Sequence, residues 1–169
     1  MTGFSPRTSP RVLGLTAAIL SLALDQASKY VLLYWAHFKD VPGVRIPVLP
    51  FFDLVMTWNP GISYGLFPVS GLGTTLLIGV VAAIIALMGL WLWRTDSAIV
   101  AIGCGLVIGG GIGNNLIDRV IYGKVADFFH FHAFGYDWYV FNIADVAVVL
   151  GAVAFIFDVL RTSESSKDA

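Results

Sequence analysis

The sequence predicts a mainly α-helical integral membrane protein, with four transmembrane helices and a small strand-rich extracytoplasmic cap between the first and second helices. Of the 169 residues, 57% are hydrophobic and 12% are charged, whereas a soluble domain has about 25% charged residues. The mean hydropathy of +0.82 agrees with this class. Four apolar segments, at about 12–34, 72–93, 97–117 and 140–160, each approach the ~20 residues that cross a bilayer as a helix. We expect a single membrane domain over residues 1–169.

The first apolar segment is predicted to stay in the membrane. It is longer than the apolar stretch of a cleaved signal peptide, carries Asp25 and Lys29, and ends without a small-x-small cleavage site. Asp25 and Lys29 are four residues apart, so they share a helix face. They either neutralise each other so that the helix can insert, or line a polar cavity. We favour the cavity, because a helix end facing lipid does not need both charges.

The segment at about 37–70 is expected to form strands on the outer membrane surface. Its β-favouring stretches are 44–48, 51–58 and 62–67. Five prolines exclude a continuous helix there: Pro42, Pro47, Pro50, Pro60 and Pro68. A shorter outer loop is expected at about 122–139, and the polar tail at about 162–169 is expected to be disordered.

The distribution of basic residues favours cytoplasmic termini, which places the segment around Asp127 on the outer side. The basic residues expected on the side of the termini are Arg7, Arg11, Arg94, Arg161 and Lys167, and those expected opposite are Lys39, Arg45, Arg119 and Lys124. A net charge of -1 argues against nucleic acid as a partner. Cys104 is the only cysteine, which excludes an internal disulfide.

The third apolar segment ends in a glycine-rich run followed by polar residues. The glycines are explained by close helix packing. Asn115, Asp118 and Arg119 fall at i, i+3 and i+4, so we expect them to form a hydrogen-bonding cluster on one helix face. The alternative is that Asp118 and Arg119 cap the helix in water.

Two aspartates flank the membrane boundary. Asp127 follows the third apolar segment, and Asp145 lies near the start of the fourth, three residues after Asn142. A carboxylate at a helix centre costs roughly 2.5–3.5 kcal/mol on insertion scales and is functional by default. Two carboxylates at the same membrane face suggest a shared acid–base site. The alternative for Asp145 is a structural hydrogen bond to a neighbouring helix.

Two other patterns suggest different chemistry and are weaker. The sequence from Gly61 to Gly65 fits Gly-x-Ser-x-Gly, but its flanks are a proline-broken loop rather than the strand–turn–helix that a serine nucleophile needs. Asp127, His130 and His132 do not match the spacing of a zinc signature. We expect neither a metal nor another cofactor.

Five blocks in order carry a resemblance to bacterial lipoprotein signal peptidases, also called prolipoprotein signal peptidases or signal peptidase II. The blocks are Asp25-Gln26-Ala27-Ser28-Lys29, Asn59-Pro60-Gly61-Ile62-Ser63, Gly110 to Arg119 ending in Asn-x-x-Asp-Arg, Val125-Ala126-Asp127-Phe128, and Phe141-Asn142-Ile143-Ala144-Asp145. The chain departs from the family at Asn114, where the family usually has Gly before the motif Asn.

The resemblance implies an aspartic endopeptidase of the bacterial inner membrane that cleaves prolipoproteins before the diacylglyceryl-modified cysteine, with its active site towards the periplasm. Asp127 and Asp145 would be the catalytic pair. The supporting residues would be Asp25, Lys29, Asn59, Gly61, Asn115, Asp118, Arg119 and Asn142. The expected partners are modified prolipoproteins and membrane lipid, and the expected state is a monomer. A small proton-coupled transporter is the alternative, and an assembly or scaffold subunit would leave the polar residues unexplained.

Overall fold

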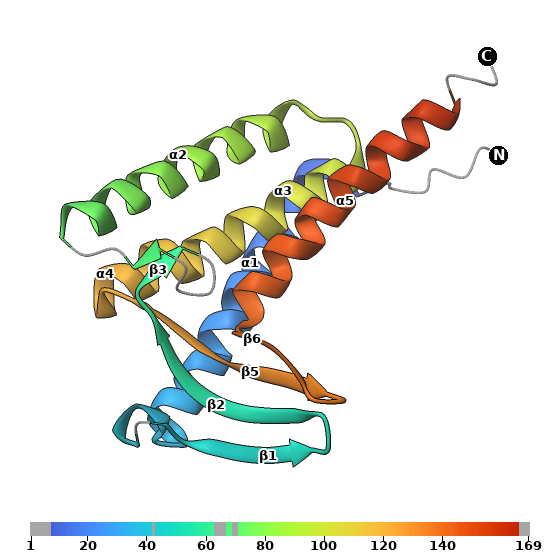
Figure 1. Ribbon diagram of the computed structural model, residues 1–169. Helices are drawn as coiled ribbons and strands as arrows, with labels where there is room; N and C mark the ends of the chain where they lie inside the picture. The colour runs from blue at the N-terminus through green and yellow to red at the C-terminus, as the bar shows by residue number, and fades with distance from the viewer. Residues whose placement is uncertain (1–7, 42, 63–66, 69–70, 166–169) are drawn as a thin grey trace.

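The computed structural model describes residues 8–41, 43–62, 67–68 and 71–165, and it is mostly helical (Figure 1). Among these residues, three helices are long and apolar enough to cross a membrane: Leu72–Arg94, Ala98–Tyr122 and Ile143–Glu164. The helical elements are α1 (Pro10–Tyr30), the π-helix η1 (Val31–Trp35), the 3-10 helix η2 (Phe38–Asp40), α2 (Leu72–Arg94), α3 (Ala98–Gly111), the π-helix η3 (Ile112–Asp118), α4 (Arg119–Tyr122) and α5 (Ile143–Ser165).

The first predicted span is a helix, but it is not among the three candidate membrane spans of the described chain. α1 begins with Ser9 as N-cap, whose side chain accepts a hydrogen bond from the backbone N–H of Val12, and with Pro10 in its first turn. Asp25 and Lys29 make the helix less apolar. Both are buried, at 0% and 3% exposure, so they face the protein interior.

Helices α1, α3 and α5 pack through glycines. Gly109 of α3 lies against Ser21 and the carbonyl of Ala18 in α1. On the α5 side, a Cβ atom at Gly110 would lie 2.6 Å from the carbonyl oxygen of Ala144. Only a residue without a side chain allows this approach, as in other close helix contacts within membranes. α3 is therefore the central helix of the group.

A four-stranded antiparallel sheet lies at one end of the helices. The order is β1 (Arg45–Leu49), β2 (Phe52–Asn59), β5 (Val125–Ala133) and β6 (Tyr136–Phe141). A separate pair is formed by the short strands β3 (Gly61–Ile62) and β4 (Phe67–Pro68). Pro47 is tolerated because β1 is an edge strand.

The prediction of a small sheet is confirmed, but the sheet was predicted to come only from the segment between the first two helices. Half of the sheet comes from the second outer loop, for which no strand was predicted. β5 pairs with β2, for example through Trp58 with Ala126 and Asn59 with Val125. These pairs join segments more than 60 residues apart.

Both ends of the fourth predicted helix need correction. It was placed at about 140–160, but Val140 and Phe141 belong to β6 and pair with β5, so α5 begins at Ile143. At the other end α5 continues to Ser165, so residues 162–165 are helical rather than disordered. Residues 166–169 lie outside the described part of the chain.

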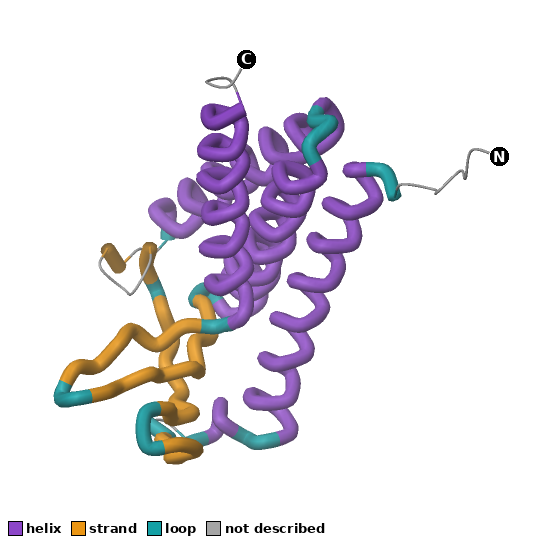
Figure 2. Tube along the Cα trace, turned by 90° about the vertical axis from the view of Figure 1, so that its right-hand side faces the viewer, coloured by secondary structure: helices purple, strands orange, loops and turns teal. Residues whose placement is uncertain are grey.

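The start of α1 and the end of α5 lie at the end of the helical group opposite the sheet (Figure 2). Beneath the sheet is a small core. Its buried members are Leu33, Phe38, Met56, Ala126 and Phe128. Because side chains alternate along a strand, burying Ala126 and Phe128 on one face of β5 turns Asp127 to the other face, where it meets the ends of the helices.

Candidate active site

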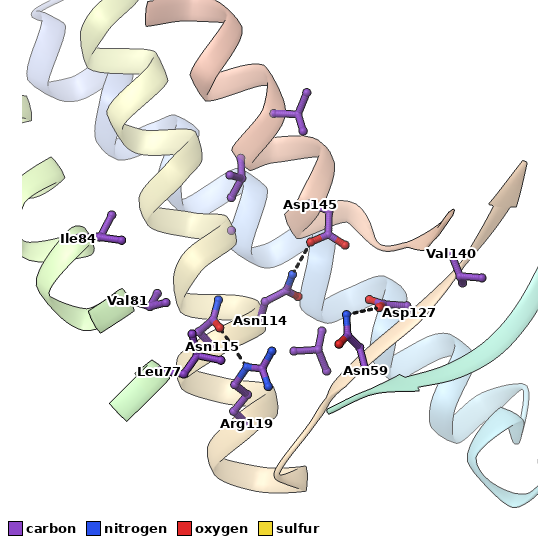
Figure 3. Close-up of a pocket in the computed structure, with 14 residues that line it drawn as sticks. Asn59, Leu77, Val81, Ile84, Asn114, Asn115, Arg119, Asp127, Val140 and Asp145 are labelled. Atoms are coloured by element: carbon purple, nitrogen blue, oxygen red, sulfur yellow. Dashed lines mark hydrogen bonds between the residues drawn. The ribbon is translucent and has the colours of Figure 1, made fainter. Parts of the chain in front are cut away.

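A cavity of about 410 Å³ lies where the sheet meets the ends of α2, α3 and α5 (Figure 3). Both predicted catalytic aspartates line it, together with polar side chains on one side and apolar side chains on the other. Its lining residues are Asn59, Leu77, Val81, Ile84, Gly110, Asn114, Asn115, Arg119, Val125, Asp127, Val140, Asp145, Val148 and Val149.

Asp127 enters the cavity from strand β5 and is 3% exposed. Its Oδ1 accepts a hydrogen bond from Asn142 Nδ2 at 2.7 Å, and its Oδ2 accepts one from Asn59 Nδ2 at 3.3 Å. Burial, followed by the charge of Asp145, raises the pKa of Asp127 to about 7, against the lowering effect of these two hydrogen bonds. A carboxyl group with this pKa holds a proton for a substantial part of the time near neutral pH.

Asp145 lies in the first turn of α5 and is held from two sides. Its Oδ2 accepts from the backbone N–H of Asn142 at 3.0 Å, while Asn142 Oδ1 accepts from the backbone N–H of Asp145 at 3.0 Å. This reciprocal pair has the form of a capping box. On the other side, Asp145 Oδ1 accepts a hydrogen bond from Asn114 Nδ2 at 2.9 Å. Asp145 thus makes the interhelix hydrogen bond of the structural alternative and also lines the cavity.

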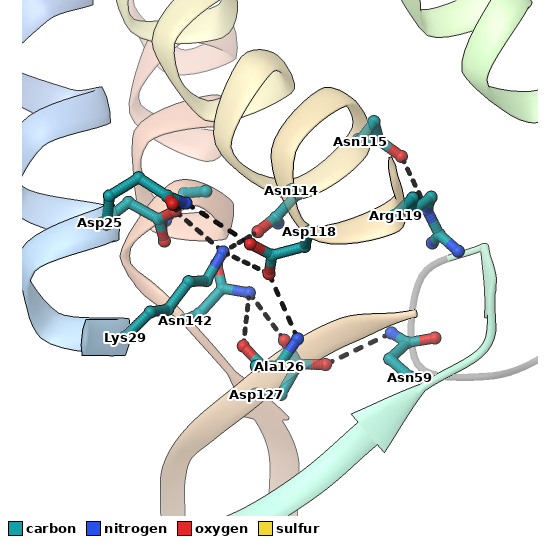
Figure 4. A network of polar contacts seen from close by, with 12 residues as sticks. Asp25, Lys29, Asn59, Asn114, Asn115, Asp118, Arg119, Ala126, Asp127 and Asn142 are labelled. Atoms are coloured by element: carbon teal, nitrogen blue, oxygen red, sulfur yellow. Dashed lines mark hydrogen bonds and ion pairs between the residues drawn. The ribbon is translucent and has the colours of Figure 1, made fainter. Parts of the chain in front are cut away.

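Behind the cavity, Lys29 is the centre of a buried polar network (Figure 4). Its Nζ lies 2.8 Å from Asp25 Oδ2, 2.8 Å from Asp118 Oδ2 and 2.7 Å from Asn114 Oδ1. Asp25 Oδ1 in turn accepts from the backbone N–H of Ala144 at 3.0 Å. The network ties α1 to η3 and to the start of α5.

The prediction that Asp25 and Lys29 line a polar cavity is therefore wrong in position. Neither residue is among those that line the cavity. They lie one layer behind it, and Lys29 reaches the cavity wall through the amide of Asn114.

Arg119 fixes the backbone that follows β2. Its guanidinium donates to the carbonyl oxygens of Pro60, at 3.5 Å, and Gly61, and its Nε donates to Asn115 Oδ1 at 3.0 Å. The backbone N–H of Gly61 also donates to Asn59 Oδ1 at 3.1 Å. Because that oxygen is occupied, the amide nitrogen of Asn59 points to Asp127.

The predicted single cluster of Asn115, Asp118 and Arg119 is divided over two faces of the helix. These residues lie in or beside η3, whose i→i+5 hydrogen bonding gives a wider turn than an α-helix. The wider turn keeps positions i and i+4 together and moves position i+3 away. Asn115 and Arg119 therefore face the cavity, while Asp118 faces Lys29.

Asn114 is a site residue that the sequence interpretation treated only as a departure from the family pattern. It lies four residues before Asp118, both residues contact Lys29 Nζ, and Asn114 is 7% exposed. The spacing of four residues from Asp118 was the available signal, because that spacing places two residues on one face in either type of helix.

The alternative chemistries find no support among the described residues. No group of three His, Cys, Asp or Glu suited to a metal occurs in the described part of the chain. His132 Nε2 lies 3.0 Å from Asp53 Oδ2, in an ion-pair cluster on the sheet. Asp127 and His130 are three residues apart on one strand and so point to opposite faces. Ser63, the candidate nucleophile, lies outside the described residues.

Comparison with known proteins gives a consistent set of matches. The family model described as signal peptidase (SPase) II matches residues 17–161. The chain is 44% identical to the lipoprotein signal peptidase of Beijerinckia indica over 163 residues, covering 95% of both chains. It is 48% identical to that of Rhodopseudomonas palustris (strain TIE-1) over 157 residues, covering 90% of this chain and 94% of the relative. A solved bacterial membrane enzyme is similar with a TM-score of 0.79 and 25% identity, covering 92% of both chains.

Proposed function

Since this chain belongs to the signal peptidase II family, and so is a protease, we propose that it is an intramembrane aspartic endopeptidase in which Asp127 and Asp145 form the catalytic pair. It removes the signal peptide from prolipoproteins by cleaving before the diacylglyceryl-modified cysteine. Asn59, Gly61, Asn115, Arg119 and Asn142 position the substrate and the pair, and Asp25, Lys29 and Asp118 hold the elements that carry them.

The observation that carries this proposal is the link between the two carboxylates through one residue. Asn142 donates from its side chain to Asp127 and from its backbone to Asp145, at 2.7 and 3.0 Å. Both carboxylates line the same cavity. Because the charge of Asp145 raises the cost of ionising Asp127, the pair favours a state with one proton.

A pair with one proton is suited to peptide hydrolysis. The ionised carboxylate takes a proton from water, and the protonated carboxyl group donates to the oxygen of the scissile carbonyl. The pKa of about 7 for Asp127 supports a protonated member at physiological pH. Neither step requires a metal or an organic cofactor.

The apolar side of the cavity supports a lipid-modified substrate. Leu77, Val81 and Ile84 of α2 and Val148 and Val149 of α5 all line the cavity. Each CH₂ group buried from water is worth about 0.8 kcal/mol. Acyl chains placed between α2 and α5 would bring the adjacent peptide bond to Asp127 and Asp145, which raises its effective concentration at the pair.

We further propose a single membrane domain with four spans in the bacterial inner membrane, with α1 as the first span. The termini are cytoplasmic and the cavity is on the periplasmic side, where the acylated cysteine of the substrate would lie. The position of the sheet opposite the start of α1 and the end of α5 supports this arrangement. No observation favours a proton-coupled transporter, since Asp127 is on a strand at one end of the helices rather than in a helix.

The test compares two peptides that differ only in the lipid on the cysteine. Purified protein in detergent is assayed with a diacylglyceryl-modified prolipoprotein peptide and with its unmodified form at equal concentration. We expect cleavage immediately before the modified cysteine and much slower cleavage of the unmodified peptide. Equal rates would replace the proposal with a general intramembrane protease, and cleavage of neither peptide would overturn it.

A further inference from the structure

We propose that Asn114 is a positioning residue that couples the buried ammonium group of Lys29 to Asp145, so that Asp145 is the ionised member of the pair and Asp127 the protonated one. This inference rests on the proposed function and assigns the two acid–base roles within it.

The orientation of the Asn114 amide is fixed by its partner on α1. A lysine ammonium group has three donors and no acceptor. The amide oxygen of Asn114 must therefore face Lys29, at 2.7 Å from Nζ. The amide nitrogen is then directed to Asp145 Oδ1, at 2.9 Å. Reversing the amide would place two donors against each other at Lys29 and leave Asp145 without this hydrogen bond.

The second oxygen of Asp145 also meets a donor that cannot reverse. Oδ2 accepts from the backbone N–H of Asn142 at 3.0 Å, in the first turn of α5, where the helix dipole favours negative charge. A proton on either oxygen of Asp145 would weaken the hydrogen bond that this oxygen accepts, because it lowers the negative charge and uses one lone pair. Hydrogen bonds to the charged form favour that form.

The amides that donate to Asp127 are oriented by backbone N–H groups rather than by an ammonium group. Asn142 Oδ1 accepts from the backbone N–H of Asp145, and Asn59 Oδ1 accepts from that of Gly61. The amide nitrogen of Asn142 has two N–H donors, one directed to Asp127 Oδ1 at 2.7 Å and one to the carbonyl oxygen of Ala126 at 3.2 Å. The bond from Asn59 is 3.3 Å long. Burial raises the pKa of Asp127, and the neighbouring charge of Asp145 raises it further.

Lys29 does not act on Asp145 alone. The charged groups around Asp145 are Asp25 and Lys29 from α1, Asp118 and Arg119 from η3 and α4, and Asp127 from β5. Asp25 and Asp118 form ion pairs with Lys29. Asn114 is the polar contact that connects this shared ammonium group to Asp145.

The assignment gives a balanced reaction. Asp145 takes a proton from water, the water oxygen bonds to the carbonyl carbon, and the proton of Asp127 moves to the carbonyl oxygen. When the C–N bond breaks, Asp145 gives its proton to the leaving nitrogen. One of the two hydroxyl groups of the tetrahedral intermediate gives its proton to Asp127, so that Asp145 is again ionised and Asp127 again protonated.

The test is the pH dependence of kcat/KM with the lipid-modified peptide. The acid limb of this profile reports the group that must be ionised, which is Asp145 in this assignment. Asn114→Ala removes one charge-assisted hydrogen bond to the ionised form. The acid limb should therefore move to higher pH by about one unit. The alkaline limb should stay in place. Asn115→Ala, one residue along the same turn, should leave the acid limb where it is, whatever it does to the rate.

The variant Asn114→Asp separates positioning from a merely structural role. The introduced carboxylate has nearly the shape of the Asn amide and can still accept from Lys29. When it is ionised it has no N–H or O–H group to donate to Asp145. We expect its acid limb to move at least as far as that of Asn114→Ala. A profile like that of the wild type would mean that Asn114 only supports Lys29, and a shift in Asn115→Ala would also overturn the inference.

A second measurement does not depend on cleavage. Infrared titration of the purified protein should show a protonated carboxyl band that disappears near pH 7 and is missing in Asp127→Asn. If that band is instead missing in Asp145→Asn and retained in Asp127→Asn, the assignment is reversed. Failure of the wild-type protein to cleave the lipopeptide would count against the proposed function and leave this infrared result to decide the inference.

Discussion

α3 and α2 are both apolar helices of similar character, but they are placed very differently. We compare the most apolar 18-residue stretch of each helix. In the helix Ala98–Tyr122, which begins as α3, 56% of that stretch is buried inside the molecule, compared with 6% in α2. α3 packs against α1 and α5 through glycines and continues into η3, which carries Asn114, Asn115 and Asp118. α2 contributes Leu77, Val81 and Ile84 to the cavity, and many of its other apolar side chains are exposed, among them Leu76, Val80, Leu87 and Leu90.

This difference separates two tasks that a membrane enzyme must combine. The proposed acid–base chemistry needs groups held to within about 0.5 Å, which is a task for the packed unit of α1, α3 and α5. The proposed lipid-modified substrate needs an apolar surface, which is a task for α2. Changes in the packed unit should therefore affect turnover and stability, and changes in α2 should affect the use of lipidated substrate.

The largest effect is expected at the two carboxylates of the proposed pair, Asp145 of the packed unit and Asp127 of the adjoining strand β5. Asp127→Asn and Asp145→Asn each keep the shape of the side chain and remove the titrating group, so each should lower kcat by at least about 10³-fold, within the range for general acid–base catalysis. Turnover of purified variants in detergent gives the measurement, and thermal unfolding gives the control for folding. Turnover near that of the wild type in either variant would remove that residue from the pair.

The next effect is on the stability of the packed unit. Lys29→Met leaves the buried carboxylates of Asp25 and Asp118 without their cation, and breaking a buried ion pair costs about 3–5 kcal/mol. We expect a large fall in the unfolding temperature. Lys39→Met is the matched control, because Lys39 is exposed and lies over the ring of Tyr34, an arrangement worth about 0.5–1 kcal/mol. Similar losses in both variants would mean that the buried network does not hold the helices together.

The sequence predicted the packed unit in part. The apolar lengths indicated the helices, and the spacing of four residues correctly placed Asp25 and Lys29 on one face. The depth of that pair was missed because Asn114, which lies between Lys29 and the cavity, was interpreted only as a departure from the family pattern, although its spacing of four residues from Asp118 places both on one face. The strands around Asp127 were missed because β5 is stabilised by pairing with β2 across 60 residues of chain, and such pairing is not visible in a local pattern.

A smaller effect tests whether the site weakens the unit that holds it. The pKa of Asp127 is raised from 3.8 to about 7 in the folded protein. Between these values the unfolded chain ionises while the folded chain keeps the proton, so the carboxyl group destabilises the folded state increasingly as pH rises to about 7. Asp127→Asn should therefore raise the free energy of unfolding at pH 7 by an amount on the order of 1–3 kcal/mol, measured as a higher unfolding temperature, and change it little at pH 4. Equal changes at the two pH values would show that Asp127 is not buried in this way.

The smallest effect is expected on α2, where it sharpens the contrast with the packed unit. Ile84→Ala removes three carbon atoms from the apolar side of the cavity, while Leu87→Ala removes as many from a residue of the same helix that does not line it. If acyl chains lie against α2, loss of about 1 kcal/mol of apolar contact should raise the KM for the lipidated peptide about fivefold in Ile84→Ala and leave it unchanged in Leu87→Ala. Neither variant should change the unfolding temperature much, since both side chains are largely exposed, at 42% and 60%. The unlipidated peptide provides the decisive comparison. If Ile84→Ala raises its KM by the same factor, α2 contacts the peptide rather than the acyl chains, and the division of tasks between α2 and the packed unit does not hold.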